Sequence, residues 1–266
     1  MNNLTSIDTT MPCEAADNPV WDRLAKRGHI NVGSDDVPAR IYYELFGTGS
    51  ERVVFLNGMG SDRQMWEPNI AEFLKLQTYQ VLVFDYPGTG FSDAGSGPSA
   101  YTTTAFAACL RSLLKALGWP KANVVGVSMG GMVALEFACN YPEMVNTLTL
   151  GVTNAGLAVP PLKGIIDTLS ANFTSDPSKR FASICKSIYT EEYLASPAPE
   201  GSGCTTMLDF CTRNAIRKSK YSRPMSFASF VGQIGTVFRH YVSPARLGDL
   251  GKTFPDKQIL IMTGDE

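Results

Sequence analysis

Short apolar runs alternate with longer amphipathic stretches in the first half of the chain. Runs of about four to eight apolar residues bounded by turn residues are typical of buried strands, and apolar residues at helical spacing are typical of helices packed on a sheet. We therefore expect strands at 29–32, 39–46, 52–58, 80–88, 123–128 and 145–152. The expected helices are 64–76, 103–118 (with Gly118 as its C-cap) and 129–142. This alternation predicts an α/β fold with a mainly parallel sheet and helices on both faces.

The pattern changes between residues 154 and 250, where no convincing strand is found. Amphipathic stretches such as 181–189 and 225–242 predict helices, and the loop 195–203 separates them. A strand pattern resumes at 257–264, so the simplest account is a helical insertion between two strands of one sheet. We divide the chain into a polar N-terminal tail (1–26), the first part of the core (27–153), the helical insertion (154–250) and a final core segment (251–266).

Composition narrows the class of protein. The 266 residues are 44% hydrophobic, with a net charge of −2 and no basic stripe, so nucleic acid and anionic membrane surfaces are not expected partners. We see neither an apolar run of about 18 residues nor a signal peptide, and we expect a cytoplasmic protein. The six cysteines form no Cys-x-x-Cys pair and only two histidines are present. We therefore expect free thiols and no metal or organic cofactor.

The strongest chemical signal is a G-x-S-x-G motif formed by Gly126, Ser128 and Gly130. It stands between an expected strand and an expected helix, and a serine on such a sharp turn projects its Oγ above the edge of the sheet. The helix N-terminus behind Ser128 favours developing negative charge. A simpler interpretation is a Gly-rich turn with an ordinary N-cap serine. The flanking strand and helix favour Ser128 as a catalytic nucleophile.

A serine nucleophile also needs two N–H donors for the oxyanion of the tetrahedral intermediate. The backbone N–H of Met129, directly after Ser128, is one candidate. We choose Met59 as the other, because it lies in the loop after an earlier strand and is flanked by Gly58 and Gly60. A dinucleotide-binding fingerprint is a competing interpretation of this glycine pair, but Arg63 stands where the third glycine would be.

In order and spacing, the chain resembles the α/β-hydrolase fold family in three stretches: NGMGSDRQMW, FDYPGTGFSD and GVSMGGMVALEFA. The likeness runs from about Arg27 to the end and is nearest to the AB hydrolase-1 type, an esterase-, lipase- and haloperoxidase-like group with a helical cap. It implies that 154–250 is the cap. It also implies a serine hydrolase of carboxyl-ester or related acyl substrates that forms an acyl-enzyme on Ser128. Asn57 stands where many members have His, which we expect to change local hydrogen bonding rather than mechanism.

The family's triad runs Ser, acid, His along the chain. Its acid commonly follows the glycine represented by Gly264 by three positions, one beyond Glu266, and Asp265 is a candidate two positions early. His240 falls in the expected cap and His29 in the first strand pair, so neither is the expected base. The resemblance therefore implies truncation before the acid, the histidine, the last strand and the C-terminal helix. Without a base Ser128 is a poor nucleophile, and we expect the chain as given to be inactive or a fragment.

One other function stays open at this point. A non-catalytic protein could keep the fold and bind a small molecule without completing the triad. Aromatic residues of the expected cap, such as Phe173 and Phe230, are compatible with an apolar acyl or alcohol group. Ester, thioester, amide and lipid substrates all remain open, and so does the oligomeric state.

Overall fold

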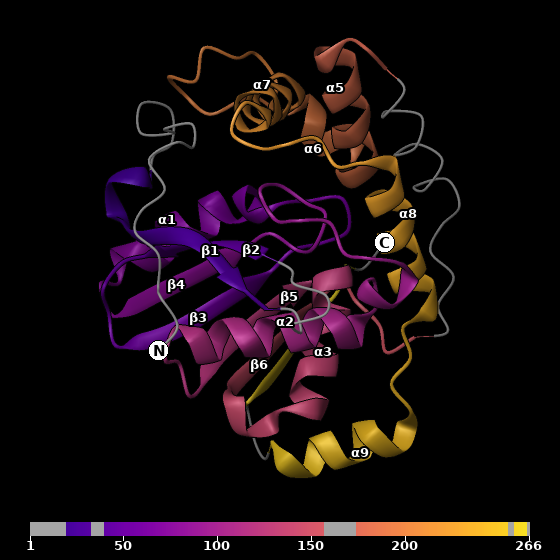
Figure 1. Ribbon diagram of the computed structural model, residues 1–266. Helices are drawn as coiled ribbons and strands as arrows, with labels where there is room; N and C mark the ends of the chain where they lie inside the picture. The colour runs from indigo at the N-terminus through magenta and orange to yellow at the C-terminus, as the bar shows by residue number, and fades with distance from the viewer. Residues whose placement is uncertain (1–19, 33–39, 157–173, 255–257, 265–266) are drawn as a thin grey trace. The chain divides into compact units, whose positions relative to one another are not determined.

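The strands of the described residues form one seven-stranded sheet (Figure 1). The computed structural model describes residues 20–32, 40–156, 174–254 and 258–264. In chain order the strands are β1 (Leu24–Asn31), β2 (Arg40–Phe46), β3 (Glu51–Leu56), β4 (Tyr79–Phe84), β5 (Ala122–Val127), β6 (Val145–Gly151) and β7 (Ile259–Met262). Their order across the sheet is β1-β2-β4-β3-β5-β6-β7.

The direction of the strands confirms the predicted α/β class. β2 pairs antiparallel with β1 and with β4, whereas the pairs β3–β4, β3–β5, β5–β6 and β6–β7 are all parallel. Parallel strands deliver the segments that follow them to one edge of the sheet. The loops after β3, β4, β5 and β6 therefore share that edge, and the motif serine follows β5.

Helices cover both faces of the sheet because side chains alternate along each strand. Val54 and Leu56 of β3 join the apolar core that α2 (Thr103–Ala116) and α3 (Met129–Asn140) also line. Val53 and Phe55 join a second core with α1 (Glu67–Lys75). Short 3₁₀ turns lie at Trp21–Arg23, Arg63–Trp66, Pro98–Ala100 and Pro142–Met144.

The ends of α2 show how local sequence sets a boundary. Thr102 accepts a hydrogen bond from the Ala105 N–H at 3.0 Å, which satisfies one of the unpaired donors of the first turn. Two residues after the helix, Gly118 has φ +69°, a left-handed conformation that glycine adopts without steric cost. The helix therefore ends earlier than predicted: its C-cap is Leu117, and Gly118, the predicted C-cap, is the left-handed residue that follows it.

The contacts between Cα atoms divide the chain into two compact units. The smaller unit, 158–222, contains α5 (Pro177–Ile188), α6 (Glu191–Ala195) and α7 (Met207–Ser219). The larger unit contains the sheet together with α8 (Phe227–Arg239) and α9 (Pro244–Thr253). The described residues from 174 to 254 contribute no strand to the sheet, but the predicted insertion 154–250 is divided between the two units.

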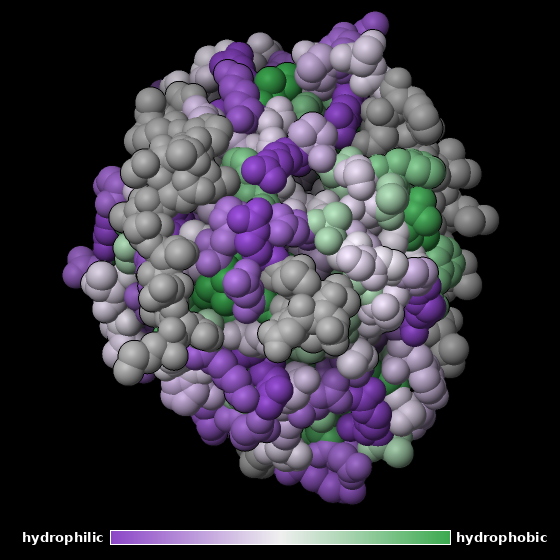
Figure 2. All heavy atoms as spheres, viewed as in Figure 1, coloured by the Kyte–Doolittle hydropathy of each residue, from purple (hydrophilic) through white to green (hydrophobic). Residues whose placement is uncertain are grey.

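Helix α8 packs on the sheet unit with its polar side. Positions spaced by four, three and four residues lie on one face of a helix. One such set is polar and buried: Ser229, Gln233, Thr236 and His240. Its apolar residues Phe227, Val231 and Phe238 are exposed, and Figure 2 shows apolar side chains over α8. Phe230 of the same helix is also buried, so the inward face of α8 is partly apolar and partly polar, and hydrogen bonds of Ser229 and Gln233 help to fix the helix to the sheet unit.

No helix in the described ranges is both long enough and apolar enough to span a membrane.

Candidate active site

Ser128 stands at the junction between β5 and α3, with an exposed side chain. Its backbone has φ 54° and ψ −124°, and its side chain makes no capping hydrogen bond to the helix. Such a conformation in a non-glycine residue costs about 1–3 kcal/mol and persists only where its surroundings enforce it. The Ser128 N–H donates to the Gly151 carbonyl of β6 at 2.9 Å, so the neighbouring strand helps to hold the turn.

The flanking glycines are required by close backbone approach. A Cβ on Gly126 would overlap the Gly130 carbonyl, and a Cβ on Gly130 would overlap the Leu56 and Asn57 carbonyls. The start of α3 therefore lies directly against the end of β3. This explains why glycines stand on both sides of Ser128, as a sharp strand-to-helix turn requires.

The carbonyl of Ser128 is fully engaged. It accepts hydrogen bonds from the N–H groups of Gly131 and Met132 at 2.9 and 3.1 Å, and from Thr153 Oγ1 at 2.8 Å. Met129 is the first residue of α3, and the first four N–H groups of an α-helix have no acceptor within the helix. The Met129 N–H thus begins the helix next to the Ser128 side chain.

The loop after β3 lies beside Ser128. A Cβ on Gly58 would come 3.7 Å from the Ser128 Cβ. The Ser61 N–H donates to the Gly58 carbonyl at 3.3 Å, and Gly60 has φ +74°. Positive φ at the third position is the pattern of a type II turn, which favours glycine there. Met59 is the second residue of this turn, one position after the glycine that approaches Ser128.

Asn57, the departure from the family pattern, forms a buried clamp. Its Nδ2 donates to the Phe84 carbonyl at 2.9 Å, and its Oδ1 accepts from Trp66 Nε1 at 2.8 Å. It is 1% exposed. Asn57 therefore joins the ends of β3 and β4 to the segment that follows the turn, and it supplies no titrating group.

A buried ion network lies behind the same loop. Arg63 donates to Glu44 Oε1 at 2.6 Å and to Asp85 Oδ2 at 3.2 Å, and Asp85 also accepts from the Phe91 N–H at 2.9 Å. Burial opposes the charge of Arg63, but Glu44 and Asp85 raise its pKa above the ordinary value. The stretch 84–93 is thus fixed to the segment after the turn by charge-assisted hydrogen bonds, which are among the stronger kind.

Neither histidine hydrogen-bonds Ser128 in the described part of the chain. His29 Nε2 lies 3.0 Å from the Phe91 carbonyl. His240 is 3% exposed, its Nδ1 lies 3.2 Å from Thr103 Oγ1, and burial lowers its pKa. The candidate acid Asp265 lies outside the described residues.

Gln233 is the residue near this loop that sequence reasoning missed. Its Oε1 accepts a hydrogen bond from the Gly60 N–H at 2.9 Å, although the two residues are 173 positions apart. Nothing in the sequence of α8 distinguishes this glutamine from a solvent-facing one. Only the packing reveals that this position of α8 is buried.

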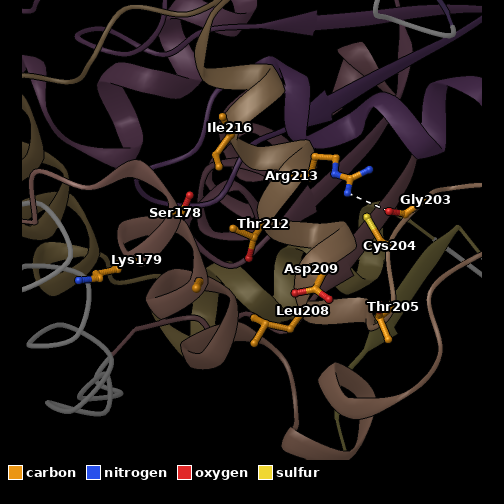
Figure 3. Close-up of a pocket in the computed structure, with 11 residues that line it drawn as sticks. Ser178, Lys179, Gly203, Cys204, Thr205, Leu208, Asp209, Thr212, Arg213 and Ile216 are labelled. Carbon is orange, nitrogen blue, oxygen red and sulfur yellow. Dashed lines mark hydrogen bonds between the residues drawn. The ribbon is translucent and has the colours of Figure 1, made fainter.

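The smaller unit has a cavity of its own (Figure 3). It measures about 580 Å³ and is lined by α5, α7 and the loop before α7, with Lys179, Asp209 and Arg213 among its charged residues. Figure 3 shows the guanidinium of Arg213 turned to the Gly203 carbonyl, with a distance of 2.9 Å. Every residue that lines it belongs to 158–222, so this cavity contains none of the motif residues.

The chain is similar in sequence to known proteins. A family model described as the alpha/beta hydrolase fold matches residues 51–178. A 2-hydroxy-6-oxononadienedioate/2-hydroxy-6-oxononatrienedioate hydrolase of Burkholderia vietnamiensis is 34% identical over 156 residues, covering 56% of this chain and 54% of that protein. A putative carbamate hydrolase RutD of Azorhizobium caulinodans is 36% identical over 112 residues, 42% of this chain and 40% of the relative. The matches thus span about half the length of these relatives or less.

Solved structures extend the likeness over most of the chain. A carboxylesterase of Nitrososphaera gargenis has a TM-score of 0.64 and 17% identity, covering 90% of this chain and 80% of its own. At that identity the likeness bears on the fold alone. The sheet order, the parallel strands and the family match agree, and this chain has the α/β-hydrolase fold.

Proposed function

We propose that this protein belongs to the serine hydrolases by chemistry, with Ser128 as the nucleophile for a carboxyl-ester or related acyl substrate. The observation that carries the proposal is the conformation of Ser128. It is strained, exposed and without a capping hydrogen bond, at the point where β5 meets α3. Backbone strain of this kind is found most often at functional sites, whereas an ordinary N-cap residue is unstrained. The two relatives described above are both named hydrolases, which supports the same class.

The chemistry assigned to this site is acyl transfer. Ser128 Oγ attacks the carbonyl carbon, a general base takes the hydroxyl proton, and the carbonyl oxygen becomes an oxyanion. The Met59 and Met129 N–H groups are our candidates for its donors, and each such donor is worth about 10²–10³ in rate. Collapse of the intermediate expels the alcohol and leaves an acyl-enzyme, which water then hydrolyses. We also propose, from the sequence, that the 154–250 helices act as a cap that selects the substrate.

The general base for Ser128 would ordinarily be a histidine, and the chain has two histidines, both described. His29 faces the Phe91 carbonyl, and His240 is buried against Thr103. Neither of these two histidines is hydrogen-bonded to Ser128 in the described part of the chain, and loss of the base in a serine hydrolase costs on the order of 10⁶ in kcat. The second candidate is a non-catalytic protein that binds a small molecule at the same place.

A test of Ser128 that does not depend on the base uses Ser128→Cys. A thiol at a helix N-terminus ionises below its ordinary pKa of about 8.5 and needs no separate base. On mixing with p-nitrophenyl acetate, the sulfur introduced at position 128 should attack the carbonyl, release p-nitrophenolate and keep the acetyl group as a thioester. Peptide mass spectrometry locates the acetyl group.

Ser243→Cys is the matched control, because Ser243 is also the N-cap of a helix in the sheet unit. The thiol at position 243 should lie at a similar helix N-terminus, but without a second loop beside it that offers an N–H donor as the turn at Met59 does. Acetylation at position 128 at least about tenfold faster than at position 243 supports the proposal. Equal rates would overturn it. The wild-type chain and Ser128→Ala then separate the two functions, because only a catalytic protein hydrolyses the ester in a Ser128-dependent way.

A further inference from the structure

Helix α8 reaches the loop beside Ser128 through one buried side chain. Gln233 is 0% exposed and comes from the buried polar face of α8. Its Oε1 accepts from the Gly60 N–H at 2.9 Å, and in the described part of the chain its Nε2 has no hydrogen-bond partner. The side-chain amide of Gln233 must direct its oxygen, and not its nitrogen, toward Gly60, because a backbone N–H needs an acceptor.

The bond is made to the middle of the turn. Gly58 to Ser61 form the type II turn, whose own hydrogen bond is long at 3.3 Å. The peptide between Met59 and Gly60 is the central one, and it distinguishes a type II turn from a type I turn by its orientation. Gln233 holds that peptide in place. It also uses the Gly60 N–H as a donor and leaves that of Met59 for a ligand.

Stability alone does not account for Gln233. A buried donor without a partner is destabilising, and an apolar side chain of the same length would avoid that cost. Gly60 is exposed, so water could serve its N–H if Gln233 were absent. The sequence nevertheless places a glutamine where methionine would fill the same space. Tolerated destabilisation of this kind points to a role in function.

We infer that Gln233 is a positioning residue. It holds the Met59–Gly60 peptide and, through this turn, fixes the preceding peptide so that its N–H, that of Met59, faces the acyl oxygen at residue 128. This inference rests on the proposed function. Gln233 touches no reacting atom and acts through the turn. It therefore affects the rate of acyl transfer more than the binding of the ester.

The test uses the Ser128→Cys protein as the parent and measures acetylation against the concentration of p-nitrophenyl acetate. Adding Gln233→Met should lower the maximal rate by about ten- to a hundredfold, since a displacement of about 1 Å can cost that much. The half-saturating concentration should not change. Gln233→Glu keeps an acceptor oxygen and should restore most of the rate. Gln233→Met also removes the unpaired Nε2, so its midpoint of urea unfolding should not fall below that of the parent.

Thr236→Val is the matched control on the same buried face of α8. Its Oγ1 bonds to the Gly232 carbonyl within the helix, so its loss should leave the rate unchanged. If Gln233→Met fails to fold, Gln233→Asn, which withdraws the acceptor by one methylene, should give the same loss of rate. Hydrogen exchange of the Gly60 amide should accelerate in each variant that lacks the acceptor.

Two results would count against the inference, and they differ. If the Ser128→Cys protein is acetylated faster than the Ser243→Cys protein but Gln233→Met does not slow it, the positioning role is wrong and the proposed function stands. If the thiol at position 128 has no advantage over the thiol at position 243, the proposed function fails and the inference fails with it.

Discussion

Two serines in the sheet unit occupy the same formal position and are built differently. Ser128 and Ser243 are the N-caps of α3 and α9. Ser243 has φ −66°, and its side chain accepts from the Arg246 N–H, as an ordinary cap does. Ser128 has φ 54° and makes no such bond. The comparison teaches that a capping position alone says little, and that strain with an uncommitted hydroxyl marks the serine available for chemistry.

The glycines near the two serines show the same contrast. Gly130 in α3 has backbone carbonyls of β3 where its Cβ would be, whereas Gly248 in α9 faces open space. The first helix begins in tight backbone contact with the sheet, and the second is an ordinary surface helix. Both helices are nevertheless joined by the ion pair of Arg246 with Glu136, at 3.1 Å.

The largest effect should come from Gly130→Ala. Its methyl group would overlap the Leu56 carbonyl, which belongs to a central strand and cannot move aside. We expect a loss of about 3 kcal/mol in the free energy of unfolding, at the upper end for overpacking. Gly248→Ala is the control and should gain about 0.5–1 kcal/mol, because alanine is the better helix former. Urea unfolding measures both, and similar values would show that α3 does not lie so close to β3.

A smaller effect should separate the two serines themselves. Ser243→Ala removes a capping bond and should cost about 1 kcal/mol. Ser128→Ala removes no capping bond and should change the free energy of unfolding by much less. A cost at Ser128 equal to that at Ser243 would mean that Ser128 is an ordinary cap after all.

Removing the backbone strain at Ser128 should raise the free energy of unfolding rather than lower it. Glycine adopts positive φ freely, so Ser128→Gly should stabilise the fold by about 1 kcal/mol after the entropy of glycine in the unfolded chain is deducted. Ser243→Gly should not stabilise, because Ser243 is unstrained. Thermal unfolding of the two variants side by side measures this difference, and a destabilised Ser128→Gly would argue against strain.

The smallest effect is a change in the pH dependence of stability that comes from His240, near helices α3 and α9. His240 faces Thr103, Glu136 on α3 and Arg246 on α9; burial lowers its pKa from 6.5, although Glu136 opposes the shift. Because the folded pKa lies below the unfolded one, the unfolded chain binds the proton first. The stability is therefore complete above about pH 6.5 and declines as the pH falls below it. His240→Gln should lose this part of the pH dependence between about pH 8 and pH 5.5, and an unchanged profile would contradict it.

Much of this architecture could be predicted from the sequence, because it depends on local pattern. Alternating apolar runs located the strands, and Gly126 and Gly130 around Ser128 marked the strand-to-helix turn. The pattern could not distinguish an N-cap serine from a strained one, since both follow a turn and precede a helix. That difference depends on backbone contacts with β3 and β6.

The remaining features depend on long-range packing. The contact of Gln233 with Gly60 joins residues 173 positions apart, and the buried polar residues of α8 look solvent-exposed in sequence. The insertion 154–250 was predicted as one segment because helical periodicity continues through it. Contacts instead place α8 and α9 with the sheet. Periodicity identifies a helix but does not say what it packs against.

The most direct test of the account is a crystal structure of Ser128→Cys acetylated by p-nitrophenyl acetate. The account predicts that the thioester oxygen accepts hydrogen bonds from the Met59 and Met129 N–H groups, with N···O distances of about 2.7–3.2 Å. The Gly60 N–H should remain bonded to Gln233. An acetyl oxygen directed to solvent, with those two nitrogens more than about 6 Å away, would contradict the assignment of this turn and of Ser128 to acyl transfer.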